Sequence, residues 1–405
     1  MSLVFQNIWR KTGTVAWLIA TIILSSLCVP FIFLIRLLSP WITFRFGYFT
    51  SDRLGHWIFD IEYYLVYQKK HFSQTPRTLD LFFLAPKPFS RKQICNSHLE
   101  TMAKRTLSVN SFFRYLFIAN NWVPCGQQST LEPARLITGS LDIHGQFSVT
   151  EPNLRFTDVE NNMGHQYLEQ IGCTSSEKLV CLIVRDNAYL QSQLGSSKDW
   201  QYHDFRDSDI ERFRQTALWL SGLGYCVVRM GKTVATTFSH SDPGVVDYAN
   251  SPERSDFLDI WLVAHSHFCI SNSTGLDEVA TVFRRPILLV DFLPLRDIRT
   301  AGVSIGMPKH LKWHSSTNHL SLDEYLEIDF RDSRKYNQHG VRIESLTSGE
   351  IEEAAREMIA LLENPSSINQ NRDQLLFWEK LNQRLKERRF IHPKARISTG
   401  FFLNH

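Results

Sequence analysis

A chain of 405 residues is too long for one ordinary hydrophobic core, so its length predicts at least two domains. Apolar residues make up 43% of the chain and charged residues 21%, a composition that excludes a wholly disordered protein. The chain has 44 Lys and Arg against 41 Asp and Glu, a near balance that argues against a dedicated nucleic-acid-binding protein.

The seven cysteines are scattered, and no two have the spacing of a zinc site or a redox pair. Cys181, Cys226 and Cys269 each lie inside an apolar, strand-like run, where a reduced thiol packs as a small hydrophobic group. The cysteine pattern therefore indicates a reducing compartment.

Residues 1–40 are predicted to form a membrane anchor. Thr14 to Ile35 is an uncharged stretch of about the length that crosses a bilayer as a helix, and it offers no good signal-peptide cleavage site. Positive charge flanks both ends, so the positive-inside rule does not fix its orientation. Pro30 leaves open a second interpretation, a kinked segment that lies in one leaflet.

Residues 41–165 are predicted to form a first α/β domain. Ile42 to Phe49 alternates in the manner of a strand, and a loop from Ser51 to His56 leads into a helical pattern that ends at Tyr64. The further predicted elements are strands at Leu81–Leu84 and Tyr115–Ala119 and a helix at Asn96–Arg105.

Residues 166–345 give the clearest pattern, a second α/β domain. Leu179 to Val184 is a continuous apolar run, as expected of a strand buried on both faces. Strands alternate with helices from there on, which predicts a parallel, doubly wound sheet. The other predicted strands are Tyr225–Val228, Phe268–Ile270 and Ile287–Val290, and the predicted helices are Asp209–Ser221, Ser255–His265 and Gly275–Phe283, followed in residues 346–405 by helices at Ile351–Leu362 and Asn371–Arg388.

Ligands of an open parallel sheet bind at the carboxyl ends of its strands. Arg185 follows the first apolar run of the second domain, and Arg229 and Gly231 follow the next strand. Because guanidinium groups pair well with phosphate oxygens, these arginines are predicted to bind a diphosphate. Each arginine has a structural alternative, an ion pair within the protein.

A small, hydroxyl-rich loop follows Phe268–Ile270 and leads into a helix, whose first amides would suit a phosphate. Thr274 with Asp277 is also the pattern of an ordinary capping box, so the loop has a structural alternative as well. Its candidate donor-binding residues are Ser271, Ser273, Thr274 and Gly275.

No metal site is predicted. Asp207-Ser208-Asp209 matches the Asp-x-Asp metal motif, but the hydrophobic strand that should precede it is missing, so helix capping by Ser208 or Asp209 is favoured. His265 and His267 could share one face of a strand, yet no third ligand is evident.

The runs YHDFRDSDIERFRQTALWLSGLGYCVVRMG (residues 202–231) and RFGYFTSDRLGH (residues 45–56) resemble a family of bacterial glycosyltransferases that is often linked to surface-polysaccharide genes. The resemblance covers roughly residues 44–330. Asp207 is a mild departure from it, because the family usually has Asn in an "RNSD" form. The resemblance implies a GT-B-like fold of two facing Rossmann-like domains and transfer of a sugar.

On that resemblance, the second domain binds a nucleotide-sugar donor and the first binds a glycan or lipid-linked acceptor. No cofactor is expected. Because the Asp-x-Asp motif is discounted, Arg185, Arg229 and the helix from Gly275 are expected to meet the diphosphate charge without a metal. His56 is the candidate general base and Asp52 the fallback, while Arg53 and Gly55 of the same loop are expected to contact the donor. The anchor would hold the enzyme on the cytoplasmic side of a bacterial inner membrane. The alternatives are another nucleotide-sugar enzyme, such as an epimerase, and a non-catalytic membrane scaffold for polysaccharide assembly.

Overall fold

The computed structural model describes residues 2–68, 77–173, 178–186, 201–238, 241–364, 372–385 and 389–403, and it leaves the side chains of 2–13 and 201–203 aside. The chain divides into two compact units, Met1–Ser140 and Leu141–His405. The expected boundary near residue 165 therefore lies later in the chain than the observed one. The reason is α7 (Asp158–Gln170), which packs on α10 (Asp256–Ala264) of the second unit.

The contact between α7 and α10 is tight. Trp261 of α10 donates a hydrogen bond from Nε1 to Oδ1 of Asn161 at 3.2 Å. Gly164 of α7 makes room for the same indole, because a Cβ there would lie 2.1 Å from Trp261 Cε2. The helix therefore belongs to the second unit through a contact that only a glycine permits.

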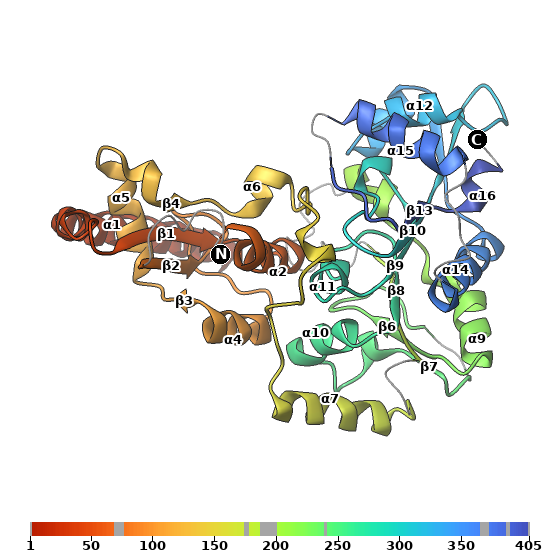
Figure 1. Cartoon of the computed structure of the whole chain (residues 1–405), viewed down its shortest axis with the longest axis horizontal. Coiled ribbons are helices and arrows are strands. Elements are labelled where there is room, and N and C mark those ends of the chain that lie inside the picture. Colours follow the sequence, from red (N-terminus) through yellow and green to blue (C-terminus); the bar gives the residue numbers. More distant parts are fainter. Residues whose placement is uncertain are drawn as a thin grey trace. The chain divides into compact units, whose positions relative to one another are not determined.

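The first unit is built on a four-stranded parallel sheet with the order β3-β2-β1-β4 (Figure 1). The central strands pair over their whole length, from Thr43 opposite Thr78 to Phe49 opposite Leu84. The expected strands at Ile42–Phe49 and Leu81–Leu84 and the helices after Ser51 and Asn96 are confirmed. The elements are β1 (Thr43–Phe49), α2 (Leu54–Tyr63), β2 (Thr78–Leu84), α4 (Ser97–Thr106), β3 (Ser108–Val109), β4 (Thr130–Leu131) and α6 (Ala134–Thr138).

The predicted strand at Tyr115–Ala119 is wrong, because this segment is part of a helix, α5 (Phe113–Trp122). The segment packs in one hydrophobic cluster with Tyr48 and Phe83 of the sheet and with Cys28 and Ile32 of the first helix. A helix that is apolar on two sides loses the one-sided pattern by which a helix is recognised.

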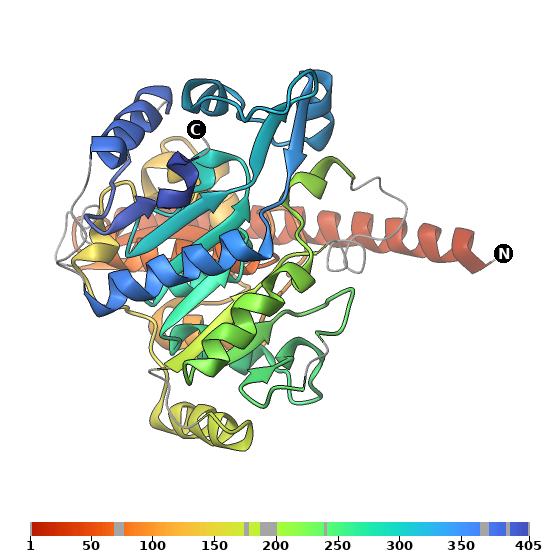
Figure 2. The same ribbon diagram turned by 90° about the vertical axis from the view of Figure 1, so that its right-hand side faces the viewer.

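The first helix, α1 (Ser2–Leu37), runs unbroken through Pro30, and Figure 2 shows it as one long rod. Its segment Thr14–Leu37 contains an 18-residue window with a mean hydropathy of 2.7, and the segment is long and apolar enough to cross a membrane. Cys28 and Ile32 nevertheless belong to the core of the first unit. The sequence pattern had indicated that residues 1–40 are separate from the domain that follows. In the structure, α1 instead contributes to the core of that domain.

The second unit is built on a seven-stranded sheet with the order β13-β10-β9-β8-β5-β6-β7, in which every pairing is parallel. This confirms the prediction of a parallel α/β unit. Helices α9 (Arg214–Gly222) and α14 (Ser348–Glu363) lie along one face of the sheet (Figure 2). The sheet's elements are β5 (Leu179–Ile183), α9 (Arg214–Gly222), β6 (Cys226–Met230), β7 (Val245–Val246), β8 (Phe268–Ser271), α11 (Asp277–Val282), β9 (Ile287–Phe292) and β10 (Ser304–Pro308).

The C-terminal residues are part of the second unit. The two expected helices are present, although the last residues of the expected helix at Asn371–Arg388 lie outside the described ranges. The chain then returns to the sheet, where β13 (Ala395–Ile397) pairs with β10. The remaining elements are β11 (His310–Trp313), α12 (Leu322–Glu327), α13 (Ser333–Gln338), β12 (Val341–Glu344), α14 (Ser348–Glu363), α15 (Arg372–Arg384) and α16 (Thr399–Phe402).

Candidate functional site

The carboxyl ends of β5 and β8 form the edge at which the sequence predicts a ligand site. These strands are neighbours in register, with Ile183 opposite Ser271. Asn272 joins the segments that follow them, because its Oδ1 accepts from the amide of Arg185 at 2.8 Å and its Nδ2 donates to the carbonyl of Arg206 at 3.0 Å. The structure therefore brings Arg185 and the loop after β8 together, as expected.

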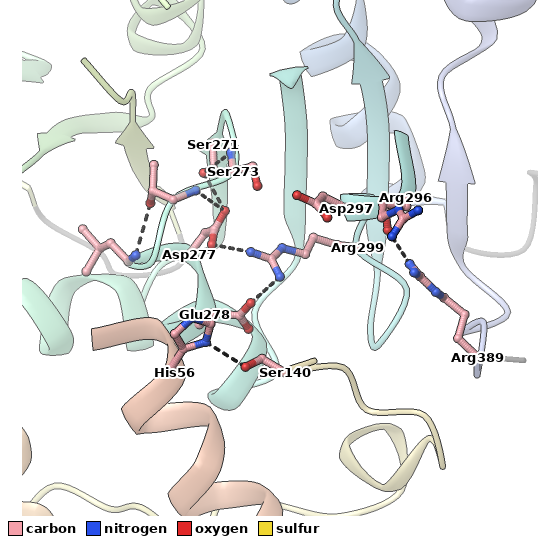
Figure 3. Close-up of polar contacts among 12 residues, drawn as sticks. His56, Ser140, Ser271, Ser273, Asp277, Glu278, Arg296, Asp297, Arg299 and Arg389 are labelled. Atoms are coloured by element: carbon pink, nitrogen blue, oxygen red, sulfur yellow. Dashed lines mark hydrogen bonds and ion pairs between the residues drawn. The ribbon is translucent and has the colours of Figure 1, made fainter. Parts of the chain in front are cut away.

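The loop Ser271–Gly275 is held by its own hydrogen bonds (Figure 3). Asp277 Oδ2 accepts from Ser271 Oγ at 2.8 Å and from the Thr274 amide at 3.1 Å. Ser273, at φ +71°, donates its amide to Ser271 Oγ at 3.3 Å. Gly275 is exposed. Two of the amides expected to bind a phosphate are thus already bonded within the protein.

The helix after this loop begins at Asp277, two residues later than expected, and has six residues. Only part of the expected capping box forms, since Thr274 donates its amide to Asp277 and Thr274 Oγ1 accepts from the amide of Leu276 at 3.1 Å. A helix this short has a weak dipole, so the positive charge at this edge comes from side chains.

Arg299 lies beside the loop and pairs with both acids of α11. It donates to Asp277 Oδ1 at 2.6 Å and also to Glu278 Oε1 (Figure 3). Burial acts to lower the pKa of Arg299, but the two carboxylates outweigh it and raise that pKa above its ordinary value. Burial raises the pKa of Glu278 to about 7, although Arg299 opposes the shift. Arg299 is therefore neutralised by the protein.

Arg206 differs from Arg299, because it has no carboxylate partner among the described residues. It donates from Nη2 to the carbonyl of Ser273 at 2.8 Å, and its Nε is buried without a partner in the described part of the chain. Burial, together with the charge of Arg185, lowers the pKa of Arg206 to about 10, while Asp297 and Asp277 act to raise it. Arg206 is therefore a charged guanidinium that no carboxylate of the described residues bonds directly, although Asp297 and Asp277 act on it from a distance.

Arg185 has an ion pair at the same edge. Its Nε donates to Asp207 Oδ1 at 3.0 Å, and both side chains are partly buried. Burial raises the pKa of Asp207, while Arg185 acts to lower it. The structural alternative for Arg185 therefore has a basis, although among the described residues the printed side-chain bond uses only its Nε.

Arg229 and Gly231 are not brought to this edge. β6 extends through Met230, so Arg229 lies inside the strand, opposite Leu182. Its side chain is 1% exposed and donates from Nη1 to the Thr236 carbonyl at 2.6 Å and to Asp247 at 3.3 Å. A Cβ at Gly231 would lie 2.7 Å from Val234 Cγ1, so this glycine permits a close turn. Both positions have structural roles.

The Asp-x-Asp pattern is used for capping and packing, as the sequence favours. Asp209 is the N-cap of the short helical turn Ile210–Phe213 and accepts from the Glu211 amide at 3.0 Å. Ser208 donates to Asp291 Oδ2 at 2.5 Å, and the same oxygen accepts from the buried Lys309 at 2.7 Å. Asp291, which follows the apolar run at Ile287, is thus fully engaged within the unit.

In the first unit, the loop Ser51–His56 follows β1 at the carboxyl edge of its sheet. His56 Nδ1 lies 2.9 Å from Ser140 Oγ, as Figure 3 shows, so Ser140 orients the imidazole. Asp52 has one buried carboxylate oxygen, Oδ1, without a partner among the described residues. Arg53 is exposed and Gly55 is buried in the first turn of α2. The loop therefore presents two groups that can accept a proton.

Sequence reasoning missed Arg206 and Arg299. The signal for Arg206 was present, because it is the Arg of the "RNSD"-like stretch Arg206–Asp209. Arg299 lies in an irregular segment between β9 and β10, where no apolar run precedes it. Its proximity to α11 depends on strand order, which the sequence pattern does not give.

Solved structures that resemble this chain include bacterial glycosyltransferases. One is the glycosyl transferase family 9 from Veillonella parvula DSM 2008, with a TM-score of 0.45 and 12% identity over 78% of this chain and 97% of that chain. Another is the E. coli ADP-heptose lps heptosyltransferase II, with a TM-score of 0.37 and 13% identity over 79% of this chain and 99% of that chain. A third is E. coli heptosyltransferase WaaC with ADP, with a TM-score of 0.33 and 10% identity over 65% and 93%.

No family model matches the chain, and no curated protein matches it. The similarity to solved structures is thus a distant one.

Proposed function

We propose that this protein is a glycosyltransferase of the GT-B type that moves a sugar from a nucleotide-diphosphate donor to a glycan or lipid-linked acceptor. In this proposal the second unit holds the donor and the first unit supplies the acceptor side. The sequence resemblance at residues 202–231 supports the reaction class. The observation that carries the donor site is Arg206, a mostly buried cation without a carboxylate partner among the described residues.

Arg206 suits a diphosphate because the protein fixes its position but gives it no direct carboxylate partner among the described residues. The side chain is anchored on Ser273 of the loop after β8, next to Arg185. A mostly buried guanidinium that no carboxylate bonds directly favours binding of an anion, since the ligand restores the interactions that burial removed. Arg206 and Arg185 are therefore the proposed diphosphate ligands, with Ser271, Ser273, Thr274 and Gly275 as the loop that shapes the site.

The proposed chemistry needs a base for the acceptor hydroxyl and positive charge for the leaving diphosphate. His56, oriented by Ser140, takes the proton as the acceptor oxygen attacks the anomeric carbon, and Asp52 is the second candidate. Arg206 and Arg185 stabilise the negative charge that grows on the leaving phosphate. Arg53 and Gly55 remain proposed donor contacts.

We further propose that the enzyme works at the cytoplasmic side of a bacterial inner membrane, in surface-polysaccharide synthesis, with α1 as its membrane attachment. The length and hydropathy of Thr14–Leu37 support the attachment. A lipid-linked acceptor fits such a location, because attachment raises the local concentration of both at the bilayer.

The experiment is a thermal-shift screen of the full chain, in detergent, against a panel of nucleotide diphosphates and their sugars, each with and without EDTA. We expect one nucleotide series to raise the melting temperature. The increase should persist in EDTA, because arginines rather than a metal ion balance the charge of the diphosphate. The Arg206→Ala variant should lose most of the shift. A panel without any stabilising nucleotide would contradict the donor site, and a shift that requires added Mg²⁺ or Mn²⁺ would contradict its metal independence.

A further inference from the structure

The surface of α1 is divided into a buried stripe and a broad exposed apolar face. Thr21 is 1% exposed and Ser25 0%, and they continue with Cys28 and Ile32 into a line at helical spacing. These residues and their neighbours pack against α5 within the first unit. Small side chains in the stripe let the two helices approach closely.

Both ends of the buried stripe are fixed to the same unit. Towards the N-terminus, the guanidinium of Arg114 lies 5.1 Å from the centre of the Trp17 ring. Towards the C-terminus, Arg36 Nη1 donates to the Pro124 carbonyl at 2.5 Å and its Nη2 to Asn120 Oδ1 at 3.3 Å. From Trp17 to Arg36 the helix rises about 28 Å, which is nearly the thickness of a bilayer's hydrocarbon core.

A helix held in this way cannot cross a bilayer and keep its contacts. A perpendicular span would carry Arg114 and Asn120 of α5 into the hydrocarbon, where a charged side chain is costly. Arg114 is already buried, and burial lowers its pKa. The residues long enough to span, Thr14–Leu37, are the same residues that lie along the first unit.

The remaining surface of α1 is apolar and exposed. At 100° per residue its members cover roughly 200° of the helix circumference, more than the stripe that a single partner helix covers. Soluble proteins rarely expose an apolar surface of this extent, so it marks a site of contact with a membrane or another protein. Its large exposed members are Val15, Ile19, Ile22, Ile23, Leu24, Leu27, Phe31, Phe33, Leu34 and Leu37.

The net charge of the first unit indicates what covers the exposed face of α1. Residues 1–140 contain 15 Lys and Arg against 6 Asp and Glu, a net charge of +9, whereas residues 141–405 contain 29 against 35, a net charge of −6. The excess positive charge therefore lies on the unit that carries α1. A unit with this net positive charge is attracted to a membrane with anionic headgroups.

We propose that α1 lies in the plane of the membrane, with its buried stripe on the first unit and its exposed face in the acyl chains of one anionic leaflet. It does not span the bilayer. Membrane insertion and packing on α5 then occur together, which a spanning helix would not allow. This proposal is independent of the sugar-transfer reaction.

Topology labelling tests the orientation. The reporters are the native Cys125, which is exposed in the first unit, and a Ser2→Cys substitution made together with Cys125→Ser. Inverted membrane vesicles from expressing cells are treated with a membrane-impermeant maleimide. Both reporters should be labelled from the same side. Labelling of the two reporters from opposite sides would show that α1 spans the bilayer and would overturn the proposal.

Vesicle sedimentation of the full chain tests whether a membrane covers the exposed face of α1. Substituting Ile19, Ile23 and Leu27 by Gln should reduce partitioning on the order of a hundred-fold, with an unchanged melting temperature. Leu375→Gln with Leu376→Gln, exposed on α15, is the matched control and should change nothing. Binding to vesicles containing phosphatidylglycerol should exceed binding to pure phosphatidylcholine at least ten-fold at low salt. A stable dimer through α1, with no binding to either vesicle, would assign the face to a second copy and overturn the proposal.

Discussion

The two parallel sheets carry different chemistry at their carboxyl ends. After β1, the first unit places Asp52 and His56, which can accept and release a proton. After β5 and β8, the second unit places Arg185 and Arg206, and Arg206 stays charged at neutral pH because its pKa is about 10. In the proposed function, the first unit therefore accepts the proton of the acceptor, and the second unit binds the anionic diphosphate.

The largest expected effect comes from the proton-accepting side. His56→Ala should reduce kcat by about 10²- to 10⁴-fold, because a positioned general base contributes that much, while donor affinity stays unchanged. Steady-state kinetics and calorimetric titration with the donor measure the two quantities. Added imidazole should restore part of kcat, which a merely structural histidine would not show.

Two further variants check the His56 prediction. Ser140→Ala should cost less than His56→Ala, since it removes only the group that orients the imidazole. Asp52→Asn tests the second candidate for the general base. A larger loss of kcat in Asp52→Asn than in His56→Ala would assign that role to Asp52.

The sheet of the second unit was predictable from sequence because its strands are continuous apolar runs separated by helices of ordinary length. Arg229 shows the limit of that reasoning. The strand was expected to end at Val228, but it continues through Met230, so the arginine is enclosed. A sequence gives the position of a polar residue after an apolar run, but the end of a strand depends on its hydrogen-bonded neighbours.

The first unit was less predictable, for a related reason. α5 is apolar on the sides that face both the sheet and α1, so its periodicity resembles that of a strand. In α1, the stripe Thr21, Ser25 and Cys28 looks like an ordinary part of an apolar stretch. Only the packing against α5 distinguishes the buried side from the exposed one.

The second prediction compares two buried arginines of the second unit. Arg206→Ala should weaken donor binding by about ten- to a hundred-fold, or about 1.5–3 kcal/mol, with little change in melting temperature. Arg206→Lys should recover only part of the affinity, since a point charge does not reproduce the guanidinium fork. Calorimetric titration of each folded variant measures the affinity.

Arg229→Ala is the matched control and should behave in the opposite way. Its guanidinium is enclosed and bonded to Thr236 and Asp247, so its loss removes the charged partner of the partly buried Asp247 and costs about 3–5 kcal/mol of stability. The folded fraction should bind the donor normally. Weakened donor binding in Arg229→Ala, with normal binding in Arg206→Ala, would place the donor at the edge of β6 instead.

The smallest expected effect concerns Asp207, the position at which this chain departs from the "RNSD" form. Asp207 accepts from Arg185 Nε and neutralises it in part. Asp207→Asn keeps an oxygen acceptor for that bond but removes the negative charge, so an incoming diphosphate is repelled less. We expect donor affinity to rise about five-fold, equivalent to about 1 kcal/mol, with kcat unchanged.

Asp332→Asn, which removes the partner of the exposed Arg334, is the control and should change neither quantity. Weaker donor binding in Asp207→Asn would mean that the ion pair positions Arg185 for the ligand, and that its charge matters less than its geometry.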